Sequence, residues 1–147
     1  MELQLGLVAD TAHADAAGKL YILGEFRYLA TAKVPAFHPQ MALVLRIAAP
    51  AVEVPTGTAK LRLQFVDIDG HKVLPQNPPE MDIRFAPVGP AERGTVNAQV
   101  ILTIGNLAIP VYGDYVIHVW VNNARLGEVK FHVLQLPTPP AAPAPSK

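Results

Sequence analysis

Apolar and polar residues alternate with a period of two along most of this chain, the pattern of β-strands with one buried face. The clearest stretch runs from Thr58 to Asp69. Its two faces consist of Leu61, Leu63 and Phe65 on one side and Lys60, Arg62 and Gln64 on the other. No stretch keeps a helical period long enough to build a helix of three turns. The chain is therefore expected to be all-β.

Further strands are expected wherever similar alternation is bounded by turn residues. They lie at 3–9, 19–26, 41–47, 71–74, 81–85 and 95–104. Asp69-Gly70 predicts a hairpin turn, and Pro79 and Pro87 favour an edge position for 81–85. The segment 10–18 is expected to be a loop or one short helical turn. The segment 35–39 is expected to be a crossing loop, because its two prolines cannot both pair in a ladder.

A final hairpin over 113–133 gives the strongest strand signal. Its turn, Asn122-Asn123-Ala124, uses asparagines that tolerate the positive φ of tight hairpins. The first arm has two faces, Tyr115, Ile117, Val119 and Val121 on one and Val116, His118 and Trp120 on the other. Neither face is plainly polar, so this arm is predicted to lie inside a sheet.

Eight to ten short strands indicate an antiparallel two-layer β-sandwich, immunoglobulin-like or jelly-roll-like in layout. A closed barrel is the alternative; prolines spread over many connections and uneven strand lengths favour the sandwich. The predicted domain covers 1–136. The proline-rich tail at 137–147 is expected to be disordered or polyproline-like, since it cannot bury apolar area or form regular backbone hydrogen bonds.

The composition limits the classes of partner that the chain is expected to bind. Half of the 147 residues are hydrophobic, and twelve basic residues balance twelve acidic ones. Such a chain supplies neither the positive field typical of nucleic-acid binding nor a polybasic segment for anionic lipid. No apolar run approaches the ~20 residues of a membrane span, and the start lacks the charged region of a signal peptide. Nucleic acid and membranes are therefore excluded, and a cytoplasmic location follows by default.

Catalytic chemistry finds little support. The chain has no cysteine, and its single serine, Ser146, lies in the tail. These facts exclude serine and cysteine nucleophiles, disulfides and thiolate metal sites. No glycine-rich phosphate loop is present, and the glutamates are scattered beside turns. The expectation is a protein that is not an enzyme and needs no cofactor.

Metal-like patterns are weak. Asp10, His13 and Asp15 share one loop and could contribute oxygen and nitrogen ligands, but no second cluster completes the set. Asp67 and Asp69 match the first positions of a calcium-binding loop. The bidentate glutamate that such a loop carries further along is missing, and a hairpin turn already explains the two aspartates. In the last hairpin, His118 and His132 need a shifted register to share a metal. No metal site is assigned.

The aromatic residues allow two interpretations. Trp120 and the tyrosines at 21, 28, 112 and 115 could form a stacking surface for a sugar or a peptide. A lone tryptophan in a sandwich more often packs between the sheets.

Several segments carry a family resemblance. They are Gly18-Lys-Leu-Tyr-Ile-Leu-Gly24 with Phe26, then Pro35 and His38-Pro39, then Val66-Asp-Ile-Asp-Gly70, and Gly113-Asp-Tyr115. In this order the chain resembles a bacterial family of small proteins known only as a domain of unknown function. The resemblance covers about 10–133. It implies a one-domain β-sandwich and brings no catalytic residues.

The leading functional hypothesis is a non-catalytic protein-binding or assembly module that uses a sheet face or an edge strand. Val116, His118 and Trp120 are its candidate contacts, because an exposed apolar face usually marks association. A protein partner or self-association is expected, with a homodimer as the simplest form. The alternatives are a small-ligand or carbohydrate-binding module using exposed aromatics and a metal-dependent enzyme built on Asp10, His13 and Asp15.

Overall fold

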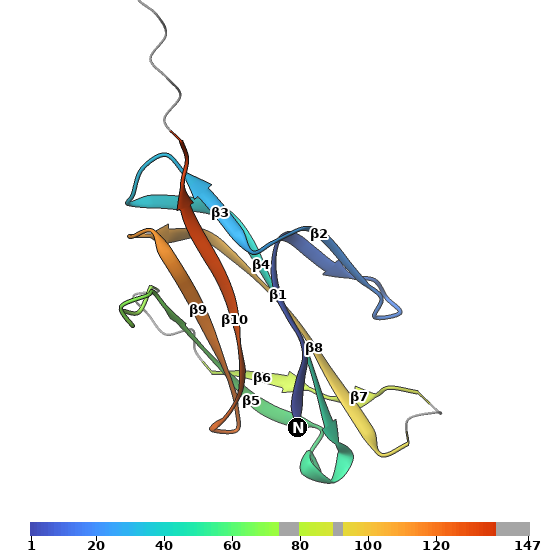
Figure 1. The fold of residues 1–147 in the computed structure, drawn as a ribbon. Coiled ribbons are helices and arrows are strands. Elements are labelled where there is room, and N and C mark those ends of the chain that lie inside the picture. The colour runs from blue at the N-terminus through green and yellow to red at the C-terminus, as the bar shows by residue number, and fades with distance from the viewer. Residues whose placement is uncertain (74–79, 90–92, 138–147) are drawn as a thin grey trace, which may run out of the picture.

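The computed structural model describes residues 1–73, 80–89 and 93–137. These residues form ten strands in two five-stranded sheets (Figure 1). The predicted all-β two-layer sandwich is confirmed. The prediction for the proline-rich tail falls almost entirely outside the described residues.

The first sheet, called sheet A here, has the strand order β2-β1-β4-β8-β7, and its pairs are antiparallel. The strands are β1 (Glu2–Ala14), β2 (Leu20–Phe26), β4 (Ala36–Pro50), β7 (Ala86–Pro87) and β8 (Thr95–Ile109). A short 3-10 turn, η1 (Ala51–Glu53), follows β4. The long pair β4–β8 is the centre of this sheet.

The second sheet, called sheet B, has the order β3-β10-β9-β5-β6. The strands are β3 (Tyr28–Thr31), β5 (Thr58–Val66), β6 (Met81–Arg84), β9 (Gly113–Val121) and β10 (Ala124–Gln135). The predicted hairpin is β9–β10, with positive φ at Asn122 and Asn123, and β9 lies inside the sheet as expected. Among the described strands only β3, for which no strand was predicted, runs parallel to its neighbour, β10.

The core lies between the sheets and is built from alternate residues of each strand. Leu43, Leu45 and Ile47 of β4 meet the buried face of β9 and β5. The inward sets predicted for the last hairpin and for 58–69 are all buried, namely Leu61, Leu63, Phe65, Tyr115, Ile117, Val119 and Val121. Burial of a large aliphatic side chain contributes about 1.5–3 kcal/mol, so these positions fix the register.

The strand predicted over 3–9 is part of β1, and its inward face changes along the strand because the register shifts between Leu3 and Leu5. Leu3 packs on the core, and after the shift Val8 points inward beside Leu43. Leu7, paired with the non-core side of β4, faces outward. One extra residue in a β-bulge moves every later side chain to the opposite face.

The loop expected at 10–18 is also shorter than predicted. β1 continues to Ala14 and pairs with β2, leaving a turn in which the Asp15 carboxylate accepts the backbone N–H of Ala17 and of Lys19, both at 2.9 Å. Beyond Ala9 this hairpin no longer pairs with β4. Figure 1 shows it turning away from β1's first half across sheet A.

The segment expected as a crossing loop, 35–39, mostly belongs to β4. Phe37 and His38 pair with β8, and pairing resumes at Gln40, so Pro39 is skipped. The opposite residue, Asn106, has a φ of 48°, which breaks the ladder locally. A proline is tolerated there because the ladder does not require its missing N–H.

Candidate functional site

The outer face of sheet B turns its side chains away from the core. It consists of Tyr28 on β3, Lys60, Arg62, Gln64 and Val66 on β5, Asp82 and Arg84 on β6, Asp114, Val116, His118 and Trp120 on β9, and Arg125, Glu128, Lys130 and His132 on β10, with Lys72 bridged to Val66. We call this set the outer face. The candidate contacts Val116, His118 and Trp120 all belong to it.

Trp120 lies on the outer face and outside the core, so the interpretation of this residue as core tryptophan is wrong. Its cross-strand neighbours are Arg62 on β5 and Arg125 on β10. The guanidinium carbon of Arg62 lies 4.8 Å from the indole centroid, within cation–π range. The indole Nε1 is enclosed and has no hydrogen-bond partner among the described residues.

Glu128 is the centre of a charged network on the same face. Its carboxylate accepts a hydrogen bond from Arg125 at 2.6 Å and contacts Lys130 Nζ at 2.9 Å. The hydrogen bond with Lys130 lowers the pKa of Glu128 and raises the pKa of Lys130 from their ordinary values. His118 Nδ1 lies 3.6 Å from Glu128. The negative charge of Glu128 is thus neutralised within the face.

The other end of the face carries an exposed aromatic ring. The Tyr28 residue is 66% exposed, and its ring meets His132 edge-on with centroids 6.2 Å apart. His132 in turn pairs with Asp114. These residues line a cavity of about 360 Å³ that Arg27 and Lys130 border with positive charge.

The charges of the chain are unevenly distributed, although they sum to zero. The outer face has an excess of three positive charges when histidines are neutral. Its cations are Lys60, Arg62, Lys72, Arg84, Arg125 and Lys130, and its acids are Asp82, Asp114 and Glu128. Net charge therefore conceals a basic face, which is a local property that composition does not reveal.

A second feature lies along one side of the sandwich, where β2 of sheet A runs through Arg27 into β3 of sheet B (Figure 1). This crossing closes part of the side, and His132 N donates to the Arg27 carbonyl at 2.8 Å. Below it, 2–7 of β1 and 124–131 of β10 have no strand neighbour on this side. We call this opening the side groove.

The side groove is a cavity of about 380 Å³. Gly6, Leu7, Val8, Phe26 and Val129 give it apolar walls, and Glu25, Arg27, Glu128 and Lys130 give it charged ones. Successive backbone groups in a strand alternate in direction. Because the His132 N–H points toward β3, the N–H and C=O of Lys130 and Glu128 point into the groove. This edge offers hydrogen-bonding groups that no strand uses.

The structure does not assemble the metal candidates Asp10, His13 and Asp15 into one group. His13 stacks on Tyr21 with centroids 4.9 Å apart, and the Asp15 carboxylate caps its turn. In the last hairpin His118 opposes Glu128, and His132 opposes Asp114.

Within the described residues, one acidic group has metal-like spacing: Asp67, Asp69 and His71. Asp67 is buried, and its Oδ1 accepts the backbone N–H of Asp69 and of His71, each at 2.9 Å. These bonds close the hairpin turn that Asp69-Gly70 predicts. The arrangement therefore has a complete structural explanation.

The fold and these surfaces define a two-sheet β-sandwich with a partly open side. The chain belongs to the family described as "Family of unknown function (DUF6941)", which matches residues 4–134. No curated protein matches the sequence. Among solved structures, the Pseudomonas fluorescens alkylpurine DNA glycosylase AlkC, bound to DNA containing an abasic site analog, matches with 13% identity and a TM-score of 0.47. The match covers 90% of this chain and 30% of that one.

The predicted partner was a protein or a second copy of this chain, with nucleic acid excluded. This exclusion does not hold, because the outer face is basic although the net charge of the chain is zero. The exclusion depended on net charge, which the basic outer face shows to be an unsafe measure. The match itself assigns no ligand to this chain. Among the described residues, no helix is long and apolar enough to cross a membrane.

Proposed function

We propose that this chain is a non-catalytic binding module that accepts an extended segment of another protein in the side groove, as a strand added to β10. The observation that carries this proposal is the unpaired edge of β10 over 124–131. Strand addition is a recurrent way in which sheets with exposed edges recognise peptides.

Hydrogen bonding supports the proposal. The peptide groups of Glu128 and Lys130 continue the row in which His132 already bonds to the chain at Arg27. An added strand in the groove would extend the closure that β3 begins. The backbone of the added strand would form hydrogen bonds with the free N–H and C=O groups along the edge of β10.

The groove walls define the segment. Leu7, Phe26 and Val129 favour apolar side chains at every second position, because alternate side chains of a strand share one face. Arg27 and Glu128, at the rim, favour a segment that carries one acidic and one basic side chain. The non-catalytic part of the proposal rests on the sequence, which has no cysteine and one serine.

Selection of displayed random peptides on the immobilised full chain tests the proposal. We expect enriched peptides with alternating apolar residues, and hydrogen exchange slowed at Glu128 and Lys130 when a selected peptide binds. Lys130→Pro should abolish binding, because the ring blocks the edge while the β9 ladder keeps its bonds. Lys130→Ala is the matched control and should bind. Binding that survives Lys130→Pro in a folded variant, or peptides protected elsewhere, would refute strand addition.

A further inference from the structure

We propose that the outer face of sheet B binds single-stranded nucleic acid, with phosphates on its free cations and bases stacked on its rings. This site shares Glu128 and Lys130 with the side groove but no other residue, and the inference does not depend on the function proposed there. It rests on the charge pairing, the aromatic groups and the unmet hydrogen bonds of the outer face.

Two of the three acids of the outer face are neutralised by cations within it, and the third, Asp114, is hydrogen-bonded to His132. Asp82 pairs with Lys60 at 2.7 Å, and Asp114 pairs with His132. Glu128 is held by Arg125 and Lys130, as described above. The cations that remain free to bind a ligand are therefore other residues than those paired with these acids.

Three cations of the face remain without an acidic partner among the described residues: Arg62, Lys72 and Arg84. They lie on or beside β5 and β6, in the rows of Arg62, Val66 and Thr58 along β5. Lysine and arginine that are free of carboxylates are the groups that bind phosphates and release their counterions. This side of the face therefore offers a track for a phosphate backbone.

The rings of Trp120 and Tyr28 supply stacking surfaces at the two ends of the outer face. The guanidinium centre of Arg62 lies 4.8 Å from the centroid of the Trp120 ring, and such a pair presents a planar cation to a base. Tyr28 is exposed at the other end. Asp114 of β9 lies in the same row as Tyr28, and it is six residues from Trp120 along the strand. This separation is about 20 Å at ~3.3 Å per residue. Several nucleotides fit along this length.

Two enclosed ring nitrogens of the outer face lack hydrogen-bond partners among the described residues, Trp120 Nε1 and His118 Nδ1. Because the indole nitrogen is enclosed, a base edge or a phosphate oxygen can accept from its N–H only after neighbouring side chains move. Unpaired bases, unlike those of a duplex, expose the faces and edges that such groups contact. These features favour a single strand over a double helix.

Fluorescence tests the proposal directly, because Trp120 is the only tryptophan in the chain. Labelled oligo-dT and oligo-U of about eight nucleotides, within the ~4–16 nucleotides typical of sheet-based single-strand sites, are titrated with the full chain at low salt. We expect both anisotropy and Trp120 emission to change. Three phosphate contacts predict a slope of log K against log salt of about −2.

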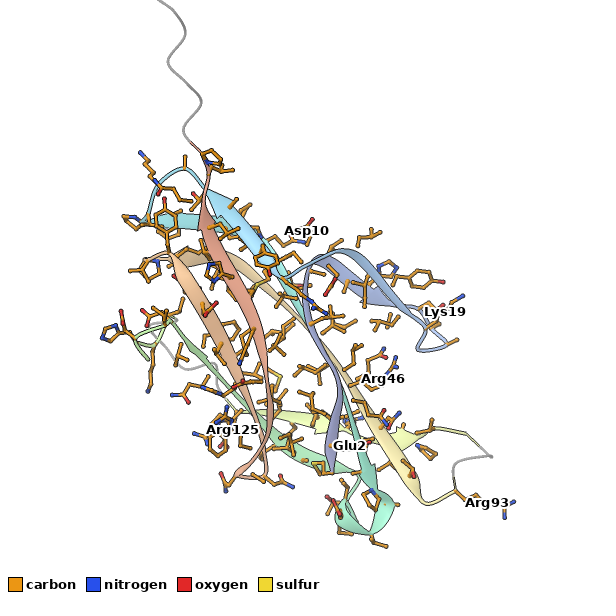
Figure 2. All side chains as sticks on the ribbon, viewed as in Figure 1. Glu2, Asp10, Lys19, Arg46, Arg93 and Arg125 are labelled. Carbon is orange, nitrogen blue, oxygen red and sulfur yellow. The ribbon has the colours of Figure 1, made fainter. Side chains whose placement is uncertain are left out.

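Arg62→Ala should weaken binding by about tenfold through lost stacking and charge, and Tyr28→Ala should weaken it by a similar factor. Arg93→Ala is the matched control, because it removes the same charge from an exposed site far from Arg125 (Figure 2). This variant should bind like the parent chain.

The proposal is overturned if no oligonucleotide binds at low salt, or if Arg93→Ala weakens binding as much as Arg62→Ala. Equal affinity for duplex DNA, heparin or polyglutamate without a change in Trp120 emission would also overturn it. That result would identify a general polyanion or acidic-protein surface. Preference for a neutral oligosaccharide would identify a carbohydrate site at Tyr28 instead.

Discussion

Gly6 of β1 lies directly against Val129 of β10, across the floor of the side groove. A Cβ atom at residue 6 would be 2.8 Å from Cγ2 of Val129, closer than real side chains approach. The two sheets therefore come this near because residue 6 has no side chain. This glycine sets the width of the opening in which the edge of β10 is exposed.

Gly6→Ala should lower the free energy of unfolding by about 1–3 kcal/mol, the usual cost of overpacking a fitted contact. Val129 is buried and cannot move freely away from the added methyl group. Urea denaturation followed by tryptophan fluorescence measures the effect. Gly105→Ala is the control, because its Cβ would meet nothing closer than 3.9 Å. Equal stabilities for the two variants would show that the sheets are not in close contact at residue 6.

Tyr115 joins β9 to the chain that precedes it. Its hydroxyl donates to the Val111 carbonyl at 2.7 Å and accepts from Val111 N at 3.3 Å, and burial raises the pKa of this phenol. Tyr115→Phe should destabilise the fold by about 1 kcal/mol, because the Val111 groups lose a buried partner. Thermal unfolding measures this loss. Tyr28→Phe, on an exposed ring, should leave the melting temperature unchanged; a matching drop there would indicate a non-specific effect of removing a hydroxyl.

The alternation of residues was sufficient to predict the layers and much of the core. Leu61, Leu63 and Phe65 are buried because they share a face and burial outweighs any other local preference. Alternation alone does not give the inward face of β1, where a register shift puts Leu5 and Leu7 on the opposite face from Leu3. A bulge is selected by tertiary contacts, such as the approach of Gly6 to Val129, which short-range patterns do not contain.

The candidate surfaces could be predicted only in part. Val116, His118 and Trp120 were identified from two apolar faces on one strand, and they do share the outer face. Their charged neighbours could not be predicted, because Arg62 meets Trp120 only through the pairing of β5 with β9. The side groove likewise depends on β3, a four-residue strand without a distinct pattern of its own.

Asp67 is the residue on which the turn after β5 depends. Asp67→Ala should destabilise the protein by about 1–3 kcal/mol, because two backbone N–H groups lose their acceptor in a partly buried site. Asp69→Ala removes a neighbouring exposed carboxylate and should have little effect. Differential scanning fluorimetry of the two variants makes the comparison. If Asp69→Ala proves the more harmful, the turn is held by a different group.

Glu128 should make stability depend on pH on the acid side. Its pKa lies below the ordinary 4.5, mainly because of the hydrogen bond with Lys130, with further support from the charges of Arg125 and His118. A lowered folded-state pKa stabilises the protein above the unfolded-state value, and this contribution is lost as pH falls through the folded-state value. The effect should be small, because the pair is exposed to solvent.

Glu128→Gln should therefore flatten the dependence of the melting temperature on pH between about 6 and about 3. Lys130 has the opposite sign: its raised pKa stabilises the fold below the ordinary 10.5, and that contribution is lost as pH rises through the folded-state value. Lys130→Gln should thus flatten the alkaline limb as well as weaken the acid one. Glu25→Gln, on another exposed carboxylate, is the control and should keep the acid slope of the parent chain. An unchanged acid slope in Glu128→Gln would mean that the Glu128–Lys130 pair does not persist in solution.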